Sequence, residues 1–210
     1  MTQQTRLIMF SGGVDSTYLL WDALVNSRDT IFAHHISLRN VENRWEKELE
    51  SVKKILEYFR NSNIRPFNYS ESLWGFPFRE YFCWDIDVVA FVASQVAANL
   101  PGNVTIYSGR VYDDNQNRLS KKHEKAGIAN DILRAACRPF PNVTPKIKKP
   151  LASIKKEEIM KKLPKDLLLL TWSCRRPVNG NPCNICKACL AKKEIQETDV
   201  LGDIISGIKG

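Results

Sequence analysis

The chain has 210 residues, of which 43% are hydrophobic and 26% are charged. A chain of this length can bury a sizeable core, and its composition excludes a disordered, collagen-like or coiled-coil protein. No stretch approaches the roughly 18 consecutive apolar residues of a membrane span, and the N-terminal run lacks the layout of a signal peptide, so we expect a cytoplasmic protein.

Short apolar runs and amphipathic stretches alternate along the chain. The runs predict strands at 6–10, 30–38, 64–69, 104–107 and 167–172. The stretches predict helices at 15–25, 42–59, 85–100, 125–136, 153–163 and 187–196, with Ser153 as a cap. Prolines are expected to break residues 139–150. This alternation predicts an α/β layered fold with a mostly parallel sheet.

The net charge of +8 is concentrated in the middle of the chain. Residues 118–165 carry 14 basic and 4 acidic side chains, a net charge of +10, whereas residues 1–117 have a net charge of −3. Such a segment suits an anionic partner, for example nucleotide phosphates, a carboxylate or RNA. A solvated basic face explains it equally well.

The strongest local signal lies between the first predicted strand and the first predicted helix. It consists of Ser11, Gly12, Gly13, Val14, Asp15, Ser16 and Thr17. Adjacent glycines allow the backbone to approach a ligand closely, and the helix start presents N–H groups and the positive end of its dipole. The serine and threonine hydroxyls add donors, so the segment predicts a cradle for phosphate oxygens. It contains neither the lysine of the Walker A motif nor the glycine spacing of a dinucleotide fold.

This SGGVDST string resembles the PP-loop of ATP pyrophosphatases. The resemblance implies a doubly wound, five-stranded parallel sheet with helices on both faces. It also implies that residues 11–17 bind the pyrophosphate end of ATP and that an acceptor oxygen is adenylated. Ser11, Gly12, Gly13 and Ser16 would hold phosphates, and Asp15 would steady the loop or a Mg²⁺ ion.

Four cysteines crowd into the C-terminal part of the chain: Cys174, Cys183, Cys186 and Cys189. Their spacing suits a closed, tetrahedral zinc site, because short spacers let one turn supply several thiolates. An iron–sulfur cluster is the alternative, since it also uses four thiolates. Disulfides are disfavoured in a reducing compartment.

Strings in the C-terminal third of the chain resemble one particular family of PP-loop enzymes. The strings KPL at 149–151 and LTWSC at 170–174, followed by three further cysteines, resemble the 7-cyano-7-deazaguanine synthases of the queuosine pathway. Asn43-Arg44-Trp45-x-x-Glu48-Leu49 resembles the family string QRH-x-x-EL and matches it at Arg44 and Glu48. The family's PGRN and YPDCR strings are absent, and these segments would line the acceptor pocket.

The resemblance implies an ATP-dependent carbon–nitrogen ligase that converts 7-carboxy-7-deazaguanine and ammonia to 7-cyano-7-deazaguanine through an adenylated carboxylate and an amide. It implies a homodimer with a PP-loop domain at 1–170 and a zinc segment at 171–210. Asp15, Ser16 and Arg44 are the candidate catalytic residues, although Arg44 also suits a purely helix-face role. Lys121, Lys122 and Lys156 are candidates to steady the departing pyrophosphate.

Three alternatives remain open at this point. A variant of the same family would stop at the amide or join the deazaguanine to another amine. A PP-loop tRNA-modifying enzyme would bind RNA through the basic segment, but no appended RNA-binding domain is evident, so we do not expect a nucleic-acid partner. A non-enzymatic zinc module would leave the intact SGGVDS string without a role.

Overall fold

A computed structural model of the chain describes residues 4–40, 42–75, 85–113, 122–186 and 188–194. Five strands form one sheet in the order β3-β2-β1-β4-β5, and all four pairings are parallel. The strands are β1 (Gln4–Met9), β2 (Thr30–Arg39), β3 (Asn68–Gly75), β4 (Asn103–Tyr107) and β5 (Val143–Lys148). The predicted α/β fold with a five-stranded parallel sheet is therefore confirmed.

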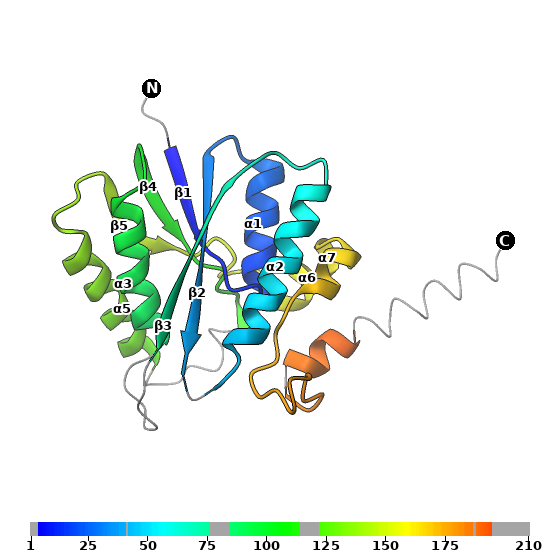
Figure 1. Ribbon diagram of the computed structural model, residues 1–210. Helices are drawn as coiled ribbons and strands as arrows, with labels where there is room; N and C mark the ends of the chain where they lie inside the picture. Colours follow the sequence, from blue (N-terminus) through cyan, green and yellow to red (C-terminus); the bar gives the residue numbers. More distant parts are fainter. Residues whose placement is uncertain (1–3, 41, 76–84, 114–121, 187, 195–210) are drawn as a thin grey trace, which may run out of the picture.

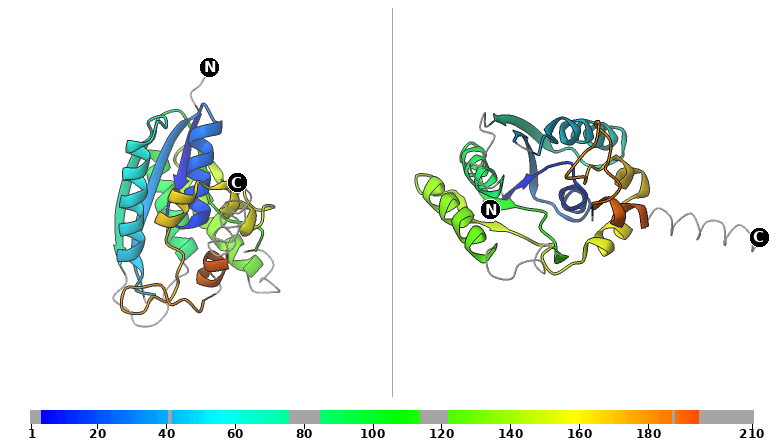
Figure 2. Two further views of the ribbon diagram at one scale, coloured as in Figure 1. Left: turned by 90° about the vertical axis from the view of Figure 1, so that its right-hand side faces the viewer. Right: turned by 90° about the horizontal axis from the view of Figure 1, so that it is seen from below.

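Helices cover both faces of this sheet (Figures 1 and 2). One layer contains α1 (Val14–Asn26), α2 (Trp45–Asn61), α6 (Lys156–Lys162) and α7 (Lys165–Leu170). The other contains α3 (Asp85–Ala98) and α5 (Lys122–Cys137). Successive β1 side chains alternate between the two cores, with Ile8 in the first and Leu7 and Met9 in the second.

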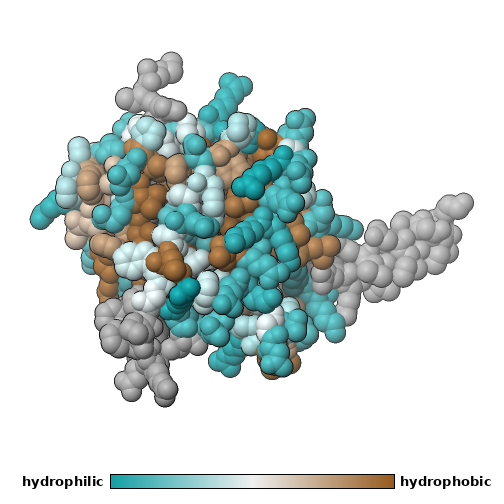
Figure 3. All heavy atoms as spheres, in the orientation of Figure 1, coloured by the Kyte–Doolittle hydropathy of each residue, from teal (hydrophilic) through white to brown (hydrophobic). Residues whose placement is uncertain are grey.

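Helix α2 illustrates why the periodic segments fold as predicted. Its buried residues Val52, Ile55 and Phe59 recur at helical spacing and face the sheet. Its other side carries charged residues, and hydrophilic side chains gather over α2 in the space-filling view (Figure 3). The helix begins at Trp45 rather than at residue 42, because Asn43 has a positive φ of 45°.

Two predicted elements are wrong in type. Residues 167–172 were expected to form a strand, but α7 occupies most of this run and continues only to Leu170. A short apolar run does not distinguish a strand from a buried helical turn, and here Leu167 and Leu168 are buried while Leu169 is 60% exposed. The proline-rich stretch was expected to be irregular, but it contains β5, an edge strand, where proline is tolerated.

Other boundaries shift without changing the topology. The third strand begins at Asn68 rather than at residue 64, and α6 is capped at Lys155 rather than at Ser153. Residues 188–194 are helical, as predicted, and the rest of that predicted helix lies outside the described residues. None of the described helices combines the length and the apolar character needed to cross a lipid bilayer. The division at residue 170 remains a prediction.

Candidate functional site

The strand order reverses between β1 and β4, which are neighbours in the sheet but far apart in sequence. In open parallel sheets, ligands bind at the carboxyl ends of the strands on either side of such a reversal, because the connecting loops diverge there. The segment after β1 is the predicted phosphate loop, and the segment after β4 begins with Ser108 and Gly109. The topology therefore places the loop where a nucleotide site is expected.

Hydrogen bonds within the loop hold it in one closed shape. The Ser11 backbone N–H donates to Ser16 Oγ (3.2 Å), the two serine oxygens lie 3.1 Å apart, and Ser16 Oγ donates to the Gly13 carbonyl (3.2 Å). Gly13 is the N-cap of α1, and no side chain caps this helix. The first-turn N–H groups of a helix have no intrahelical acceptor, so this end of α1 presents donors suited to an anion.

Both glycines of the loop are closely surrounded, and Gly12 more tightly than Gly13. Gly12 has a φ of +74°, and a Cβ at this position would lie 2.9 Å from Val52 Cγ2 and 3.2 Å from the Glu48 carbonyl oxygen. A Cβ on Gly13 would lie 3.3 Å from the carbonyl oxygen of Trp172. The loop is thus enclosed by α2 on one side and by the segment after α7 on the other.

The turn after β4 packs directly on the start of α1. A Cβ on Gly109 would lie 2.7 Å from the Asp15 carbonyl carbon and 2.7 Å from the Ser16 nitrogen. Only a residue without a side chain allows the two backbones to come this close. Nothing in the local sequence identifies this contact, and the sequence analysis did not select Gly109.

Asp15 and Lys156 form an ion pair at the edge of the loop. Lys156 Nζ lies 2.9 Å from Asp15 Oδ2, and both side chains are about three-quarters buried, with exposed fractions of 27% and 21%. The backbone N–H of Lys156 donates to Asp113 Oδ2 (2.6 Å), which fixes the start of α6. The structure therefore brings the candidate Lys156 to the loop. Lys121 lies outside the described residues.

The remaining loop residues lie in the first turn of α1. Val14 and Thr17 are buried, with exposed fractions of 1% and 0%, and the backbone N–H of Thr17 donates to the Gly13 carbonyl. The Thr17 hydroxyl has no hydrogen-bond partner among the described residues. Their predicted contacts with ATP stay predictions.

Arg44 lies at the start of α2 among three carboxylates. Its guanidinium contacts Glu42 (2.6 Å), Glu48 (3.1 Å) and Asp85 (3.0 Å), and this last contact joins α2 to α3. Burial raises the pKa of Glu48 to about 7, against the attraction of Arg44. Arg44 is thus fully engaged within the protein, and its catalytic role stays a prediction.

The four cysteines converge as their spacing predicts. The sulfur atoms of Cys174, Cys183, Cys186 and Cys189 all lie within 4.8 Å of one another, so the cluster can hold a metal ion. Backbone N–H groups of Cys183 and Cys186 donate to the sulfurs of Cys174 (3.3 Å) and Cys183 (3.4 Å). Such bonds stabilise thiolates, the form in which cysteine binds metals. In Figure 1 the orange segment that carries the cluster lies to the right of the lower end of α2 and below α6 and α7.

The two adjacent histidines are structural. They point to opposite faces of β2, as expected of neighbours in a strand. His34 is hydrogen-bonded to Ser70 Oγ (2.7 Å) and Ser72 Oγ (3.0 Å), and His35 Nδ1 lies 3.0 Å from the Phe10 carbonyl. Burial lowers the pKa of both, that of His34 to about 4, so both are neutral at pH 7.

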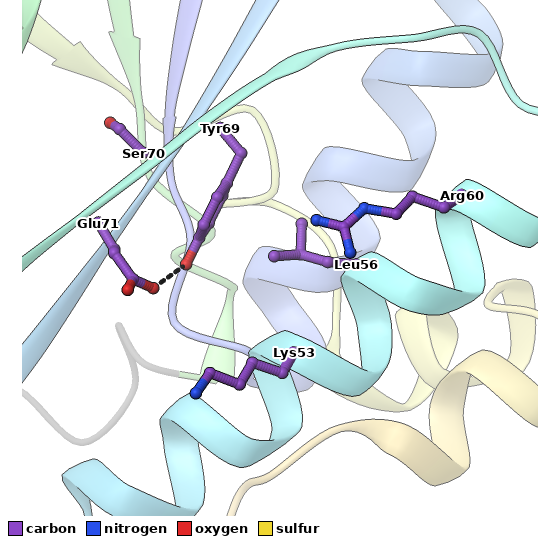
Figure 4. Close-up of a pocket in the computed structure, with 6 residues that line it drawn as sticks. All are labelled: Lys53, Leu56, Arg60, Tyr69, Ser70 and Glu71. Carbon is purple, nitrogen blue, oxygen red and sulfur yellow. Dashed lines mark hydrogen bonds between the residues drawn. The ribbon is translucent and has the colours of Figure 1, made fainter.

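A separate hollow of about 460 Å³ lies between α2 and β3. Figure 4 shows Lys53 and Arg60 reaching over it from α2, with the Tyr69 hydroxyl bonded to Glu71 (2.9 Å) on the strand side. None of its lining residues belongs to the loop or to the cysteine cluster. We therefore place the candidate site at the loop and not in this hollow.

Comparison with known proteins identifies the fold. No family model matches the sequence, and no curated protein matches it. Among solved structures, the chain is similar to the U34-tRNA thiolase NcsA from Methanococcus maripaludis with its [4Fe-4S] cluster, with a TM-score of 0.57 and 12% sequence identity. The match covers 93% of this chain but only 64% of the thiolase chain. At this identity the likeness shows the fold alone, a parallel α/β sheet like that of the thiolase.

Proposed function

We propose that this chain is an ATP-dependent enzyme that adenylates an acceptor oxygen at the phosphate loop. The observation that carries the proposal is the closed loop at the sheet's reversal point, with Lys156 paired to Asp15 beside it. The loop donors would bind the pyrophosphate end of ATP, Asp15 would hold Mg²⁺, and Lys156 would neutralise charge on the departing pyrophosphate. Such sites act mainly by orientation and charge stabilisation.

The proposed acceptor is the carboxylate of 7-carboxy-7-deazaguanine. The LTWSC string that carries the family resemblance lies against the loop, since the backbone N–H of Trp172 donates to the Gly12 carbonyl (2.9 Å). Attack of the carboxylate on the α-phosphorus releases pyrophosphate and gives an acyl adenylate. Ammonia then displaces AMP to form the amide, and a second adenylation, on the amide oxygen, allows loss of AMP to give the nitrile.

The proposed metal is zinc. Zinc–sulfur bonds of about 2.3 Å in a tetrahedron place the sulfurs about 3.8 Å apart. An iron–sulfur cubane would separate them further, because four irons and four sulfides lie between the thiolates. The 4.8 Å limit on all the sulfur separations favours a single ion. Metal analysis should find about one zinc ion per chain, and the purified protein should be colourless. A brown protein with iron and acid-labile sulfide would contradict this assignment.

Product analysis tests the proposed reaction. The protein is incubated with MgATP, ¹⁵N-ammonium and 7-carboxy-7-deazaguanine, and the masses of the products are measured by mass spectrometry. We expect labelled amide followed by labelled nitrile, and neither product with Asp15→Ala. Accumulation of amide alone would identify the amide-forming variant. Absence of both products, with ATP bound, would rule out this acceptor.

A second candidate is a tRNA-modifying enzyme, favoured by a basic hollow near the loop. This hollow, of about 440 Å³, lies at the end of β5, and its lining includes Tyr107, Lys146, Lys148 and Lys149. The Lys148 carbonyl accepts the Ser108 N–H (3.0 Å), next to the turn that packs on α1. RNA bound here would lie beside the adenylation site.

Titration of labelled tRNA at several salt concentrations distinguishes this candidate. If RNA is the substrate, affinity should fall steeply with salt, and a Lys146→Ala/Lys148→Ala double variant should flatten that dependence, since each phosphate contact contributes to the slope. Affinity that does not depend on these two lysines would exclude the hollow as an RNA site.

A further inference from the structure

A short series of contacts joins the cysteine cluster to the phosphate loop. The Trp172 backbone N–H donates to the Gly12 carbonyl (2.9 Å), and the Trp172 carbonyl oxygen lies 3.3 Å from where a Cβ on Gly13 would be. The indole Nε1 donates to the Cys174 carbonyl (3.0 Å). Cys174 is itself one of the four clustered cysteines, so a single residue separates a metal ligand from the residue that contacts the loop.

Ser51 of α2 supports the same junction from the other side. Its hydroxyl lies 3.1 Å from the Gly12 carbonyl and 2.6 Å from the Leu170 carbonyl, and the side chain is 5% exposed. The single proton of this hydroxyl is shared between the two carbonyls, so Ser51 links α2 both to the loop at Gly12 and to the segment before the cluster at Leu170. Because Gly12 has a positive φ and little space for movement, these bonds define the orientation of the peptide that follows it.

The helical segment that follows the cluster also contacts the end of α7. Lys192, three residues after Cys189, donates to the Thr171 carbonyl (2.9 Å) and lies 3.3 Å from the Leu169 carbonyl. Few apolar side chains support the cysteine segment, where Val178 and Ile185 are 59% and 81% exposed. Bonds from the cysteines to a metal would therefore add order to this segment.

We propose that metal binding at the cluster positions the phosphate loop, so that metal and nucleotide bind with positive thermodynamic coupling. Trp172 and Ser51 are the positioning residues that carry this coupling. The inference rests on the proposed binding of ATP at the loop. Coupling between two sites is reciprocal, so each ligand must raise the affinity for the other by the same factor.

The test measures both affinities on the full-length protein. Calorimetry gives the affinity for MgATP with zinc bound and after chelation. Competition with a chromogenic chelator in excess Mg²⁺ gives the affinity for zinc with and without MgATP. We expect equal factors of roughly 5- to 150-fold, the usual range for coupled sites. Ser51→Ala should reduce both factors together. Ser62→Ala removes a hydroxyl that donates to the Tyr58 carbonyl at the other end of α2, and it should leave both factors unchanged.

The outcomes separate this inference from the proposed function. ATP binding of equal strength with and without zinc, or zinc affinity that ATP does not change, would overturn the coupling and leave the proposed function intact. Absence of ATP binding to the zinc-loaded protein would overturn both. If the chelated protein unfolds, the test uses only the zinc-loaded, folded protein. The zinc affinity is then measured with and without MgATP in the wild type and in Ser51→Ala. An ATP effect of equal size in the two proteins would refute the role of Ser51.

Discussion

The contact between Gly109 and the start of α1 gives the sharpest prediction for the proposed nucleotide site. A methyl group in Gly109→Ala would lie 2.7 Å from two backbone atoms of Asp15 and Ser16. Ordinary carbon contacts are about 3.5 Å or longer, so one backbone must move by about 0.8 Å. Overpacking of this kind costs about 1–3 kcal/mol of stability. Because the displaced atoms belong to the phosphate loop, we also expect ATP binding to weaken at least tenfold.

Calorimetric titration with MgATP and urea unfolding check this prediction. Gly127→Ala is the matched control, because a Cβ there meets nothing within 4 Å and lies in α5. It should leave ATP affinity unchanged and stabilise the protein by up to about 1 kcal/mol, since alanine is the better helix former. Wild-type ATP affinity in Gly109→Ala would refute the argument that this turn fixes the loop.

Three further predictions concern charged groups. Lys156→Met should weaken MgATP binding about tenfold or more, because a charge-assisted contact is worth about 1.5–3 kcal/mol, and calorimetry measures the change. Burial raises the pKa of Glu48 from 4.5 to about 7, so the native state retains a proton that the unfolded chain releases. The free energy of unfolding should therefore fall by about 3 kcal/mol as the pH rises from 4.5 to about 7. Urea unfolding measures this fall, and Glu48→Gln should abolish it. Burial lowers the pKa of His34 from 6.5 to about 4, so the unfolded chain binds a proton at a higher pH than the native state does. The contribution of His34 to the free energy of unfolding should therefore be lost as the pH falls from 6.5 towards 4. His34→Gln should remove that loss, and an unchanged pH profile in either variant would contradict the assignment.

The parts of the fold that the sequence predicted are those with strong local signals. A glycine pair before a helix marked the loop, and four closely spaced cysteines marked the cluster that can hold a metal ion, because both depend on residues that are near one another in the chain. The parallel sheet followed from the alternation of strands and helices. By contrast, the apolar run of α7 fits either type of element, and only its packing against α2 and the core settles which one forms.

The missed features depend on contacts between distant segments. Gly109 is an ordinary turn glycine in the sequence, and only its approach to Asp15, 94 positions earlier, gives it a role. Ser51 bonds to Gly12 and Leu170, and no local pattern distinguishes it from other helix serines. Arg44 was singled out from a local string, but its three carboxylate partners, one of them on α3, come together only in the folded chain.

The most direct test of the account is the position at which ATP is cleaved. ³¹P NMR of the protein with MgATP, ammonia and 7-carboxy-7-deazaguanine reports which phosphate bond breaks. Adenylation at the loop predicts AMP and pyrophosphate, formed only when the acceptor is present and lost in Ser16→Ala. Formation of ADP and inorganic phosphate, or cleavage that Ser16→Ala does not affect, would contradict the claim that this loop directs adenylate to an acceptor oxygen.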